Sequence, residues 1–406
     1  MQNQKIAING KRLEETIERF ADFGRTDNNG VTRLALSDED VGSRNYLVEC
    51  CEALGLHVTK DDLGNQYARF EGSDPKADPV YVGSHLDSVK KGGRYDGALG
   101  VIAALEVIRT MIDYSIQPKR PIILVNFTNE EGARFEPSMM SSGVLSGKFN
   151  QEEMNEKRDQ NGVTFLEALK ESGYEGKADE RLTNGKAFLE LHIEQGPVLE
   201  QEEITIGAVE CVVGMVCYEI EVLGDSNHAG TTPMAMRDDA LFTAVDTIQS
   251  LRNRLDQLDE RLVYTIGRIE ASPNIHTVIP NRIVFSLEAR HQDEEIIDKV
   301  EQIIHSFKER NRIEPKRLWQ RDTVWFDSAV VKVVEEASKQ LGTTHRRMVS
   351  GAGHDAQFIA SMMPTAMIFV PSLRGKSHSE DEYTSPKDCI AGVNVLFEAV
   401  STLSQE

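Results

Sequence analysis

Long apolar runs are missing from this sequence. Runs such as residues 122–125 (IILV) are far shorter than the roughly 20 residues that a membrane-spanning helix needs. Residues 1–16 also lack the apolar core of a secretory signal peptide. We therefore expect a protein that does not cross a membrane and that works in the cytoplasm.

Cysteine is scarce and shows no pairing pattern. The 406-residue chain has five cysteines, two of them adjacent, and none of them forms a CxxC motif. This pattern argues against a disulfide framework and against a zinc site built from thiolates, and it favours a reducing compartment. None of the five stands out as a catalytic nucleophile.

A surplus of basic charge is also absent. Lys and Arg number 45 against 66 Asp and Glu, which gives a formal net charge of -21. Nucleic acids and anionic membranes favour clustered Lys and Arg, so we expect neither as a partner. The composition, 40% apolar and 27% charged, is that of a folded globular protein, and the length is enough for two domains.

The first third of the chain alternates helical and extended patterns. Residues 11–24, 37–56 and 97–114 have helical periodicity, whereas residues 57–62, 65–72, 79–85 and 121–127 are typical of strands. Strands separated by long helices imply crossover connections. The pattern therefore predicts an α/β domain whose mostly parallel sheet is flanked by helices.

The pattern changes near residue 212. Strand-like stretches at 214–224, 262–270 and 281–290 combine with helical stretches at 238–258 and 294–311, an order that is typical of a small α+β domain with an antiparallel sheet. The α/β pattern returns after Trp325. We therefore predict a discontinuous domain, residues 1–211 and 326–406, with residues 212–325 as an inserted domain.

Polar residues stand where the predicted strands of the larger domain end. Glu130 and Glu131 follow a buried strand side by side, where each raises the cost of ionising the other. The wider set comprises His85, Asp96, Glu131, His192 and His378. Because sites in parallel α/β sheets form at the carboxyl ends of strands, these side chains can meet. Three imidazoles and two carboxylates suit a pair of zinc, manganese, cobalt or nickel ions, without choosing among them.

Each of these residues also has a plainer interpretation. His85 and His192 could be structural histidines, Asp96 could cap the helix that follows it, and Glu130 with Glu131 could form an exposed acidic turn. Asp96 can cap the helix and still bridge two cations. If Glu131 binds a cation, Glu130 is placed to act as the general base that takes a proton from an activated water.

The ordered motifs GSHLDSV, GGRYDGALGV, NEEGARF, ELHIEQGPVLE, NHAGTTPM, GAGHDA and SHSEDEYT resemble those of the hydantoinase/carbamoylase family of amidohydrolases. This family belongs to the dinuclear-metal aminoacylase and carboxypeptidase superfamily, and the resemblance runs from about residue 10 to the end. It implies that the five residues of the set above bind two metal ions, with Asp96 as the bridge. It also implies that the inserted domain is a lid and dimerisation domain of a homodimer.

The resemblance assigns further roles. It places Glu130 as the catalytic base, and it puts substrate contacts at Gln195, His228, Thr277, Arg290 and His354. His228 would reach the active site of the partner subunit, and His228 and His354 would stabilise the oxyanion. Arg290 would hold a substrate carboxylate in a bidentate fork. An arginine that ends a strand is more commonly a surface residue, and His228 could simply stabilise the turn at Gly230.

Two neighbours of these positions add detail. Asp87, two residues after His85, is expected to orient the imidazole of His85. Thr277 departs from the family, which usually has an asparagine there that contacts the substrate, so the substrate contact is reduced to a hydroxyl or the substrate differs. Arg374 and Lys376 add basic charge near His378, where a solvated loop is the plainer interpretation.

The resemblance implies a hydrolase of linear ureido C–N bonds. The preferred substrate is an N-carbamoyl-L-amino acid, which needs one carboxylate anchor and yields the amino acid, ammonia and CO2. Allantoate is the close alternative, followed by the substrate of β-ureidopropionase. An aminoacylase or dipeptidase on the same scaffold is a more distant alternative, which the EQGP stretch at residues 194–197 disfavours. A binding protein with a degenerate site is disfavoured by the intact ligand set.

Overall fold

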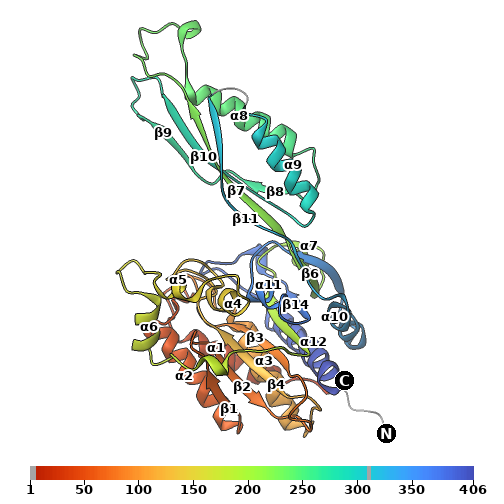
Figure 1. The fold of residues 1–406 in the computed structure, drawn as a ribbon. Coiled ribbons are helices and arrows are strands. Elements are labelled where there is room, and N and C mark those ends of the chain that lie inside the picture. Colours follow the sequence, from red (N-terminus) through yellow and green to blue (C-terminus); the bar gives the residue numbers. More distant parts are fainter. Residues whose placement is uncertain (1–5, 309–311) are drawn as a thin grey trace. The chain divides into compact units, whose positions relative to one another are not determined.

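The computed structural model describes residues 6–308 and 312–406 and divides the chain into two compact units. The first unit joins the chain up to Glu210 to Trp325–Glu406, and the second is Cys211–Val324. Figure 1 labels the elements of both units, which are described separately below. In the described part of the chain, no helix combines the length and the apolar character that crossing a membrane requires.

The first unit is built on a mixed sheet whose strands follow the order β1-β2-β4-β3-β5-β14-β6-β12, with β13 pairing to β6. The strands are β1 (His57–Lys60), β2 (Gln66–Phe70), β3 (Val80–His85), β4 (Ile122–Phe127), β5 (Ala187–Ile193), β6 (Ile206–Val212), β12 (Val324–Trp325), β13 (His345–Ser350) and β14 (Thr365–Val370).

The centre of this sheet is parallel. Strand β3 pairs in parallel with β4 and with β5, and β5 pairs in parallel with β14. Every residue of these four strands is buried, as continuous apolar runs in a parallel sheet require. The flanking pairs β1–β2, β2–β4 and β6–β14 are antiparallel. Strands β1 and β2 form a hairpin because Asp61 accepts the N–H groups of Leu63 and Asn65 and closes the turn between them.

Helices flank the sheet. The longer ones are α1 (Gly10–Ala21), α2 (Asp38–Ala53), α3 (Ala98–Asp113), α10 (Ser328–Leu341) and α12 (Pro386–Gln405). Helix α3 packs on β3, β4 and β5 and touches α12, so nearly all of its side chains are buried. The shorter helices are α4 (Met140–Leu145), α5 (Gln151–Asn155), α6 (Phe165–Glu171), α7 (Val198–Gln201) and α11 (Asp355–Ile359), with 3-10 turns at Ala178–Glu180 and Leu373–Gly375. The predicted fold class, a mostly parallel sheet with flanking helices and an inserted α+β part, is confirmed.

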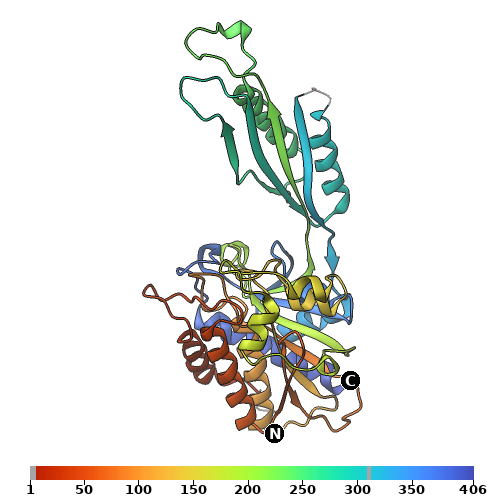
Figure 2. The ribbon, with the colours of Figure 1, turned by 60° about the vertical axis from the view of Figure 1, so that its left-hand side comes forward.

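The second unit is an antiparallel sheet with two helices on one face (Figure 2). Its strands are β7 (Gly214–Leu223), β8 (Val263–Thr265), β9 (Ile269–Ser272), β10 (Arg282–His291) and β11 (Ile313–Arg321), and its helices are α8 (Ala240–Leu255) and α9 (Glu294–His305), with a 3-10 turn at Met234–Met236. Alternate residues of β7 and β10, such as Ile220 and Phe285, form the core with both helices.

The second unit differs from its predicted elements in three places. The stretch predicted as one strand, 262–270, forms two strands, because its pairing with β10 shifts by one residue between Thr265 and Ile269. The N–H of Arg268 binds Oγ of Ser286 on β10 instead of a backbone carbonyl. Strand β11 was not predicted, since most of its side chains are exposed and Pro315 interrupts the pattern. The predicted helix 294–311 ends at His305 as α9, and its residues 309–311 lie outside the described part of the chain.

Candidate metal centre

Four adjacent parallel strands deliver the polar residues to one edge of the first unit. His85 ends β3, His192 lies one residue before the end of β5, and the Glu130–Glu131 pair follows β4. His378 lies in the segment that follows β14, and Asp96 directly precedes Gly97, the residue that caps the amino terminus of α3. Because the strands are parallel, their carboxyl ends share this edge. The structure brings these side chains together at the carboxyl ends of the strands.

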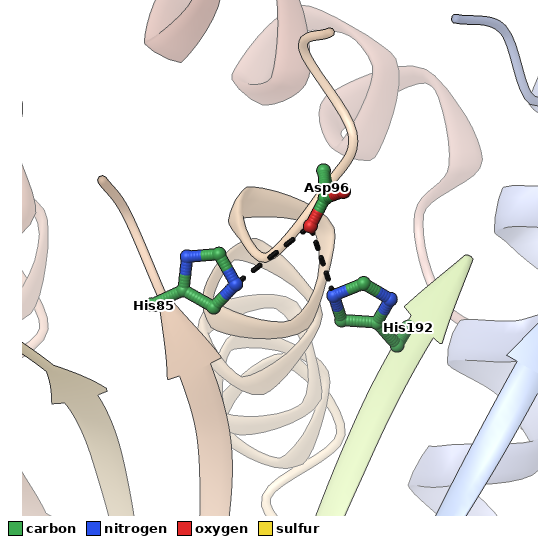
Figure 3. A group of neighbouring side chains, drawn as sticks. All are labelled: His85, Asp96 and His192. Carbon is green, nitrogen blue, oxygen red and sulfur yellow. Dashed lines mark ion pairs between the residues drawn. The ribbon is translucent and has the colours of Figure 1, made fainter. Parts of the chain in front are cut away.

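Figure 3 shows the first group of side chains, His85, Asp96 and His192. The Oδ1 of Asp96 lies 3.1 Å from Nε2 of His192 and 3.7 Å from Nε2 of His85. All three side chains are buried. One ligand atom from each lies within 4.8 Å of the other two, which is a spacing that one cation can span.

A second group shares Asp96 with the first. Nε2 of His378 lies 3.2 Å from Oε2 of Glu131 and 3.5 Å from Oδ2 of Asp96. The ligand atoms of Asp96, Glu131 and His378 again lie within 4.8 Å of one another. Asp96 therefore offers Oδ1 to one group and Oδ2 to the other, which is the arrangement of a carboxylate that bridges two cations. His378 is the most exposed member, with 52% of its side chain accessible.

Hydrogen bonds orient both buried imidazoles. Nδ1 of His85 lies 2.9 Å from the carbonyl oxygen of Asp87, and Nδ1 of His192 lies 2.9 Å from the carbonyl oxygen of Ile193. A carbonyl only accepts, so each Nδ1 carries a proton, and the neutral tautomer with this proton has its lone pair on Nε2, the nitrogen that faces Asp96. This tautomer is the one that binds a metal through Nε2, and the partner at Nδ1 fixes it.

The role predicted for Asp87 belongs to its backbone. The carbonyl of Asp87 holds His85, whereas its carboxylate oxygen lies 3.8 Å from Nδ1. The carboxylate instead accepts the backbone N–H groups of Glu130 and Glu131, each at 3.2 Å. Asp87 thus positions the imidazole of His85 through its backbone carbonyl, and it positions the Glu130–Glu131 pair through its carboxylate. The side chain of Glu130 points to His85, with Oε2 at 3.5 Å from Nε2.

Burial and charge act strongly on these groups. Burial raises the pKa of Glu130 well above its usual value, with further increases from Asp355 and Glu131. Burial also raises the pKa of Glu131, and it lowers the pKa of His85 to about 4. Burial alone would raise the pKa of Asp96, but the charge of His192 and the neighbouring imidazoles lower it well below its usual range.

The residues fit a pair of divalent cations on three observations. Nε2 of His85 and Oε1 of Glu131 are buried and have no hydrogen-bond partner among the described residues, which costs free energy unless a ligand is bound. The N–H of Gly97 points at Nε2 of His192 (3.2 Å), and this contact favours a nitrogen that carries no proton. The negative charge of Asp96, in contrast, favours a positive charge at the same nitrogen. A cation beside that nitrogen provides the positive charge without a proton.

The backbone makes room for this group at Gly97. Its φ is +62°, and a Cβ added there would lie 2.2–2.4 Å from the ring atoms of His85. Any side chain at this position would therefore displace the imidazole. The glycine of the YDGALG stretch is thus explained by the approach of the α3 amino terminus to the His85 ring.

Two predicted substrate contacts also lie at this edge. Nε2 of Gln195 donates to Oδ2 of Asp96 at 2.8 Å, and its Oε1 is buried with no hydrogen-bond partner among the described residues. His354 is buried before α11, with its ring centroid 4.5 Å from that of His192. Nε2 of His354 lies 3.0 Å from Oγ of Ser350.

The other three predicted substrate contacts belong to the second unit. His228 lies in a loop, where its Nδ1 accepts the N–H of Gly230 at 2.9 Å, so the plainer interpretation of its local role holds. The carbonyl of Thr277 accepts the N–H of Ala229, which brings His228 and Thr277 into one loop cluster. Arg290 lies on β10 beside Ala289, which faces the helices, so Arg290 points to the opposite face and pairs with Glu288 at 2.6 Å.

Three carboxylates at this edge were not predicted from the sequence. Glu382 accepts the N–H groups of Tyr95 and Asp96, each at 3.0 Å. Glu190 accepts from Oγ of Ser84 at 2.7 Å and from the N–H of Ala356 at 3.2 Å, and Asp355 accepts from Ser142. Glu190 lies two residues before His192, and Asp355 directly follows His354. Glu382 lies in the SHSEDEYT motif. Proximity to these motifs is the one sequence feature that could have drawn attention to them.

Comparison with known proteins places the chain in a family. The model of peptidase family M20/M25/M40 matches residues 81–402. An N-carbamoyl-L-amino-acid amidohydrolase of Rhizobium meliloti is 36% identical over 97% of this chain and 96% of its own length. An allantoate amidohydrolase of Bacillus subtilis is 35% identical over the full length of both chains.

The same relationship is seen in three dimensions. The crystal structure of an amidase of the hydantoinase/carbamoylase family from Burkholderia multivorans aligns with a TM-score of 0.94 at 40% identity, covering 99% of both chains. The resemblance stated from the motifs is thereby confirmed. The chain belongs to peptidase family M20/M25/M40, within its hydantoinase/carbamoylase branch, and is a hydrolase acting on amide C–N bonds.

Proposed function

We propose that this protein hydrolyses the linear ureido group of an N-carbamoyl-L-amino acid to the L-amino acid, ammonia and CO2, using two divalent cations per subunit. The observation that carries the proposal is the shared position of Asp96. It contributes one oxygen to the group with His85 and His192 and the other to the group with Glu131 and His378. The names of relatives 36% identical along nearly the whole chain support the substrate class.

Bound cations at these two groups would polarise the scissile carbonyl and make a water acidic enough to deprotonate near neutral pH. The chain supplies the remaining steps. Glu130 takes the proton of the attacking water and later delivers it to the leaving nitrogen, for which its position beside His85 is suitable. His354 lies next to His192, where it can donate a hydrogen bond to the developing oxyanion.

Gln195 is suited to recognise the ureido group. Its amide nitrogen is fixed on Asp96, so the amide cannot turn freely, and its buried oxygen still has an unused acceptor position. A ureido NH2 group is a donor that fills this position. We propose that Gln195 binds the terminal nitrogen of the substrate and aligns the carbamoyl carbon with the two metal groups.

The substrate carboxylate requires a cationic partner. We propose Arg290, whose guanidinium can form two parallel hydrogen bonds to a carboxylate. Arg290 already pairs with Glu288 in the structure, so substrate binding would exchange one carboxylate for another. Thr277 offers a hydroxyl where the family usually has an amide, which weakens one substrate contact and leaves Arg290 as the main anchor.

We further propose a homodimer formed through the second unit, in which His228 serves the active site of the partner. The chain alone exposes an apolar surface on α8, where Phe242 is 56% and Val245 is 50% accessible. Strand β9 forms a ladder with β10, and Ile269 on it is also exposed. Exposed apolar residues beside a strand edge are typical of interaction surfaces.

Allantoate is the second candidate substrate. The allantoate amidohydrolase of Bacillus subtilis matches this chain from end to end at 35% identity, close to the value for the carbamoylases. Allantoate carries two ureido groups beside its carboxylate, so the same metal groups, Glu130 and Arg290 would serve. The choice between the two substrates depends on what the pocket accepts beyond the carboxylate.

A substrate panel tests the proposal. Full-length protein reconstituted separately with Mn²⁺, Zn²⁺, Co²⁺ or Ni²⁺ is assayed for ammonia release from N-carbamoyl derivatives of several L-amino acids, their D-enantiomers and allantoate. We expect the highest kcat/KM for one of the N-carbamoyl-L-amino acids. A preference for allantoate would select the second candidate. N-acyl amino acids and dipeptides are assayed in parallel by release of the free amino acid, and turnover of these compounds alone would exclude both candidates.

A further inference from the structure

The loop that carries His378 is tied to the segment that carries Asp96 by one buried carboxylate. Oε1 of Glu382 accepts the backbone N–H groups of Tyr95 and Asp96, each at 3.0 Å. These are the two residues immediately before the glycine that opens α3. Glu382 lies four residues after His378, so its side chain reaches from one metal-binding segment to the other.

The second oxygen of Glu382 continues this connection. Oγ of Ser377 lies 3.1 Å from Oε2 of Glu382 and 2.7 Å from Oδ2 of Asp96. Nε2 of Gln195 lies 3.3 Å from the same hydroxyl. Ser377 is the residue directly before His378, so the hydroxyl links the bridging carboxylate to the backbone of the neighbouring ligand. Glu382 and Ser377 together hold Asp96 by its backbone and by its side chain.

The sequence leaves space for this contact. A Cβ added to Gly93 would lie 1.9 Å from Oε1 of Glu382, so a larger residue at position 93 would expel the carboxylate. The ring of Tyr383 also packs edge-on against the ring of Tyr95, with centroids 6.0 Å apart. The two segments are therefore matched by packing as well as by hydrogen bonds.

His378 needs such support more than the other ligands. His85 and His192 lie in buried strands, whereas His378 is half exposed and lies in a loop with a φ of +52°. A non-glycine residue in this backbone region is strained and keeps its conformation where its surroundings impose it. The contacts of Ser377 and Glu382 hold the loop on both sides of His378.

We propose that Glu382 is a positioning residue that sets the affinity for the cation of the Asp96–Glu131–His378 group by holding Asp96 and the His378 loop in one arrangement. The inference rests on the two-cation site of the proposed function. The carboxylate of Glu382 binds backbone N–H groups and the hydroxyl of Ser377 rather than the side-chain atoms that would hold the cation. Its effect passes through the backbone of Asp96 and through Ser377.

The test measures metal content rather than turnover. Full-length holo protein is equilibrated in a graded series of chelator-buffered Zn²⁺ solutions, and bound zinc per subunit is determined by elemental analysis. The wild type is expected to hold two ions. Because removing an outer partner of a metal ligand costs about 10–100-fold in affinity, Glu382→Ala should lose one ion at about 10–100-fold higher free zinc than the wild type. The second ion should be lost near the wild-type value.

Three variants separate positioning from general damage. Glu382→Gln keeps an oxygen for both N–H groups and should remain within about threefold of the wild type, because the backbone contacts persist. Ser377→Ala removes the side-chain link alone and should shift the same ion by a smaller factor. Glu380→Ala is the matched control, since Glu380 lies in the same loop but binds Thr26 and Asn28. It should bind both ions as the wild type does.

The outcomes distinguish this inference from the proposed function. A wild-type protein that holds fewer than two ions contradicts the two-cation proposal itself. A wild type with two ions, together with unchanged affinities in both Glu382→Ala and Ser377→Ala, overturns the role of Glu382 alone. The role of Glu382 is also contradicted if Glu380→Ala lowers the affinity for the ion as much as Glu382→Ala does, or if Glu382→Gln lowers it as much as Glu382→Ala does. Thermal midpoints of all variants in excess chelator identify any that fail to fold, and Ser377→Ala then carries the test.

Discussion

Asp87 and Glu131 are joined by a hydrogen bond from the backbone N–H of Glu131 to Oδ2 of Asp87, at 3.2 Å. Oδ1 of the same carboxylate accepts the N–H of Glu130. The carbonyl of Asp87 holds the ring of His85. One residue therefore sets the position of two proposed ligands, His85 and Glu131, and of the proposed base, although His85 ends β3 and Glu131 lies in the loop after β4.

This relationship predicts the effect of Asp87→Ala. Without the carboxylate, two buried N–H groups lose their partner and the turn that carries Glu130 and Glu131 is no longer held. We expect kcat to fall by about 10–100-fold together with a lower metal content, the range seen for outer partners of metal ligands. Steady-state kinetics and elemental analysis measure both. Asp78→Ala, at an exposed residue before β3, is the control and should behave as wild type. Unaltered kinetics in Asp87→Ala would show that the turn holds itself.

Glu130→Gln should separate metal binding from turnover. The amide keeps the size of the side chain but cannot take a proton from water, so kcat should fall by about 10²–10⁴-fold while the metal content stays the same. Glu136→Gln, at an exposed residue six positions along the same loop, should leave kcat unchanged. Turnover that survives in Glu130→Gln removes Glu130 from the mechanism.

Arg290→Lys should reveal whether a bidentate anchor is used. Lysine keeps the positive charge but cannot form the two parallel hydrogen bonds, so kcat/KM for an N-carbamoyl-L-amino acid should fall by about 10–100-fold, or ~1.5–3 kcal/mol. The matching N-carbamoyl amino acid amide has no carboxylate, and its low kcat/KM should not change. Arg282→Lys is the control, since Arg282 lies on the same strand and pairs with Glu221. Equal losses for both substrates would assign Arg290 a structural role.

The proposed contribution of His228 to the partner subunit can be tested by complementation. His228→Ala and Glu130→Gln are each expected to be nearly inactive. If His228 acts in the partner, a mixed dimer of the two variants contains one site with both Glu130 and His228 intact. Equal mixing with subunit exchange should then restore about one quarter of the wild-type activity. A mixture as inactive as its components, or a fully active monomer in sedimentation, rules out this arrangement.

The ion pair between Asp62 and Arg181 predicts a pH-dependent contribution to stability. Burial alone would raise the pKa of Asp62, but two hydrogen bonds from Arg181, at 2.6 and 2.8 Å, and one from Gln151 lower it. A carboxyl whose pKa is lowered on folding stabilises the protein above its unfolded pKa, about 4, and loses this contribution as the pH falls through its folded pKa.

Asp62→Asn should therefore cost about 1 kcal/mol at pH 7 and progressively less below pH 4. The urea midpoints of variant and wild type, compared at pH 7 and at pH 3.5 after metal removal, measure the difference. Asp78→Ala provides the control for a change at an exposed carboxyl. A difference that stays constant or grows as the pH falls would contradict a lowered pKa for Asp62 in the folded protein.

Much of the candidate site could be predicted from the sequence because strands and their exits leave a periodic pattern. The buried runs before His85, Glu130 and His192 identify parallel strands, and the geometry of such sheets brings their carboxyl ends together. The irregular parts were harder. Strand β11 was missed because an exposed edge strand has no apolar alternation, and the break between β8 and β9 depends on a one-residue shift in their pairing with β10.

The sequence by itself determined which chemical groups are available and that the sheet delivers them to one edge, since apolar periodicity encodes burial and strand direction follows from long helical connections. Only the tertiary structure decided that Asp96 faces two ligand groups, that the carboxylate of Asp87 serves the glutamate turn rather than His85, and that Glu382 reaches Asp96 across 286 positions of the chain. Hydrogen bonds between segments so far apart depend on distances and angles that exist once the chain has folded, and they leave no periodic trace in the order of residues.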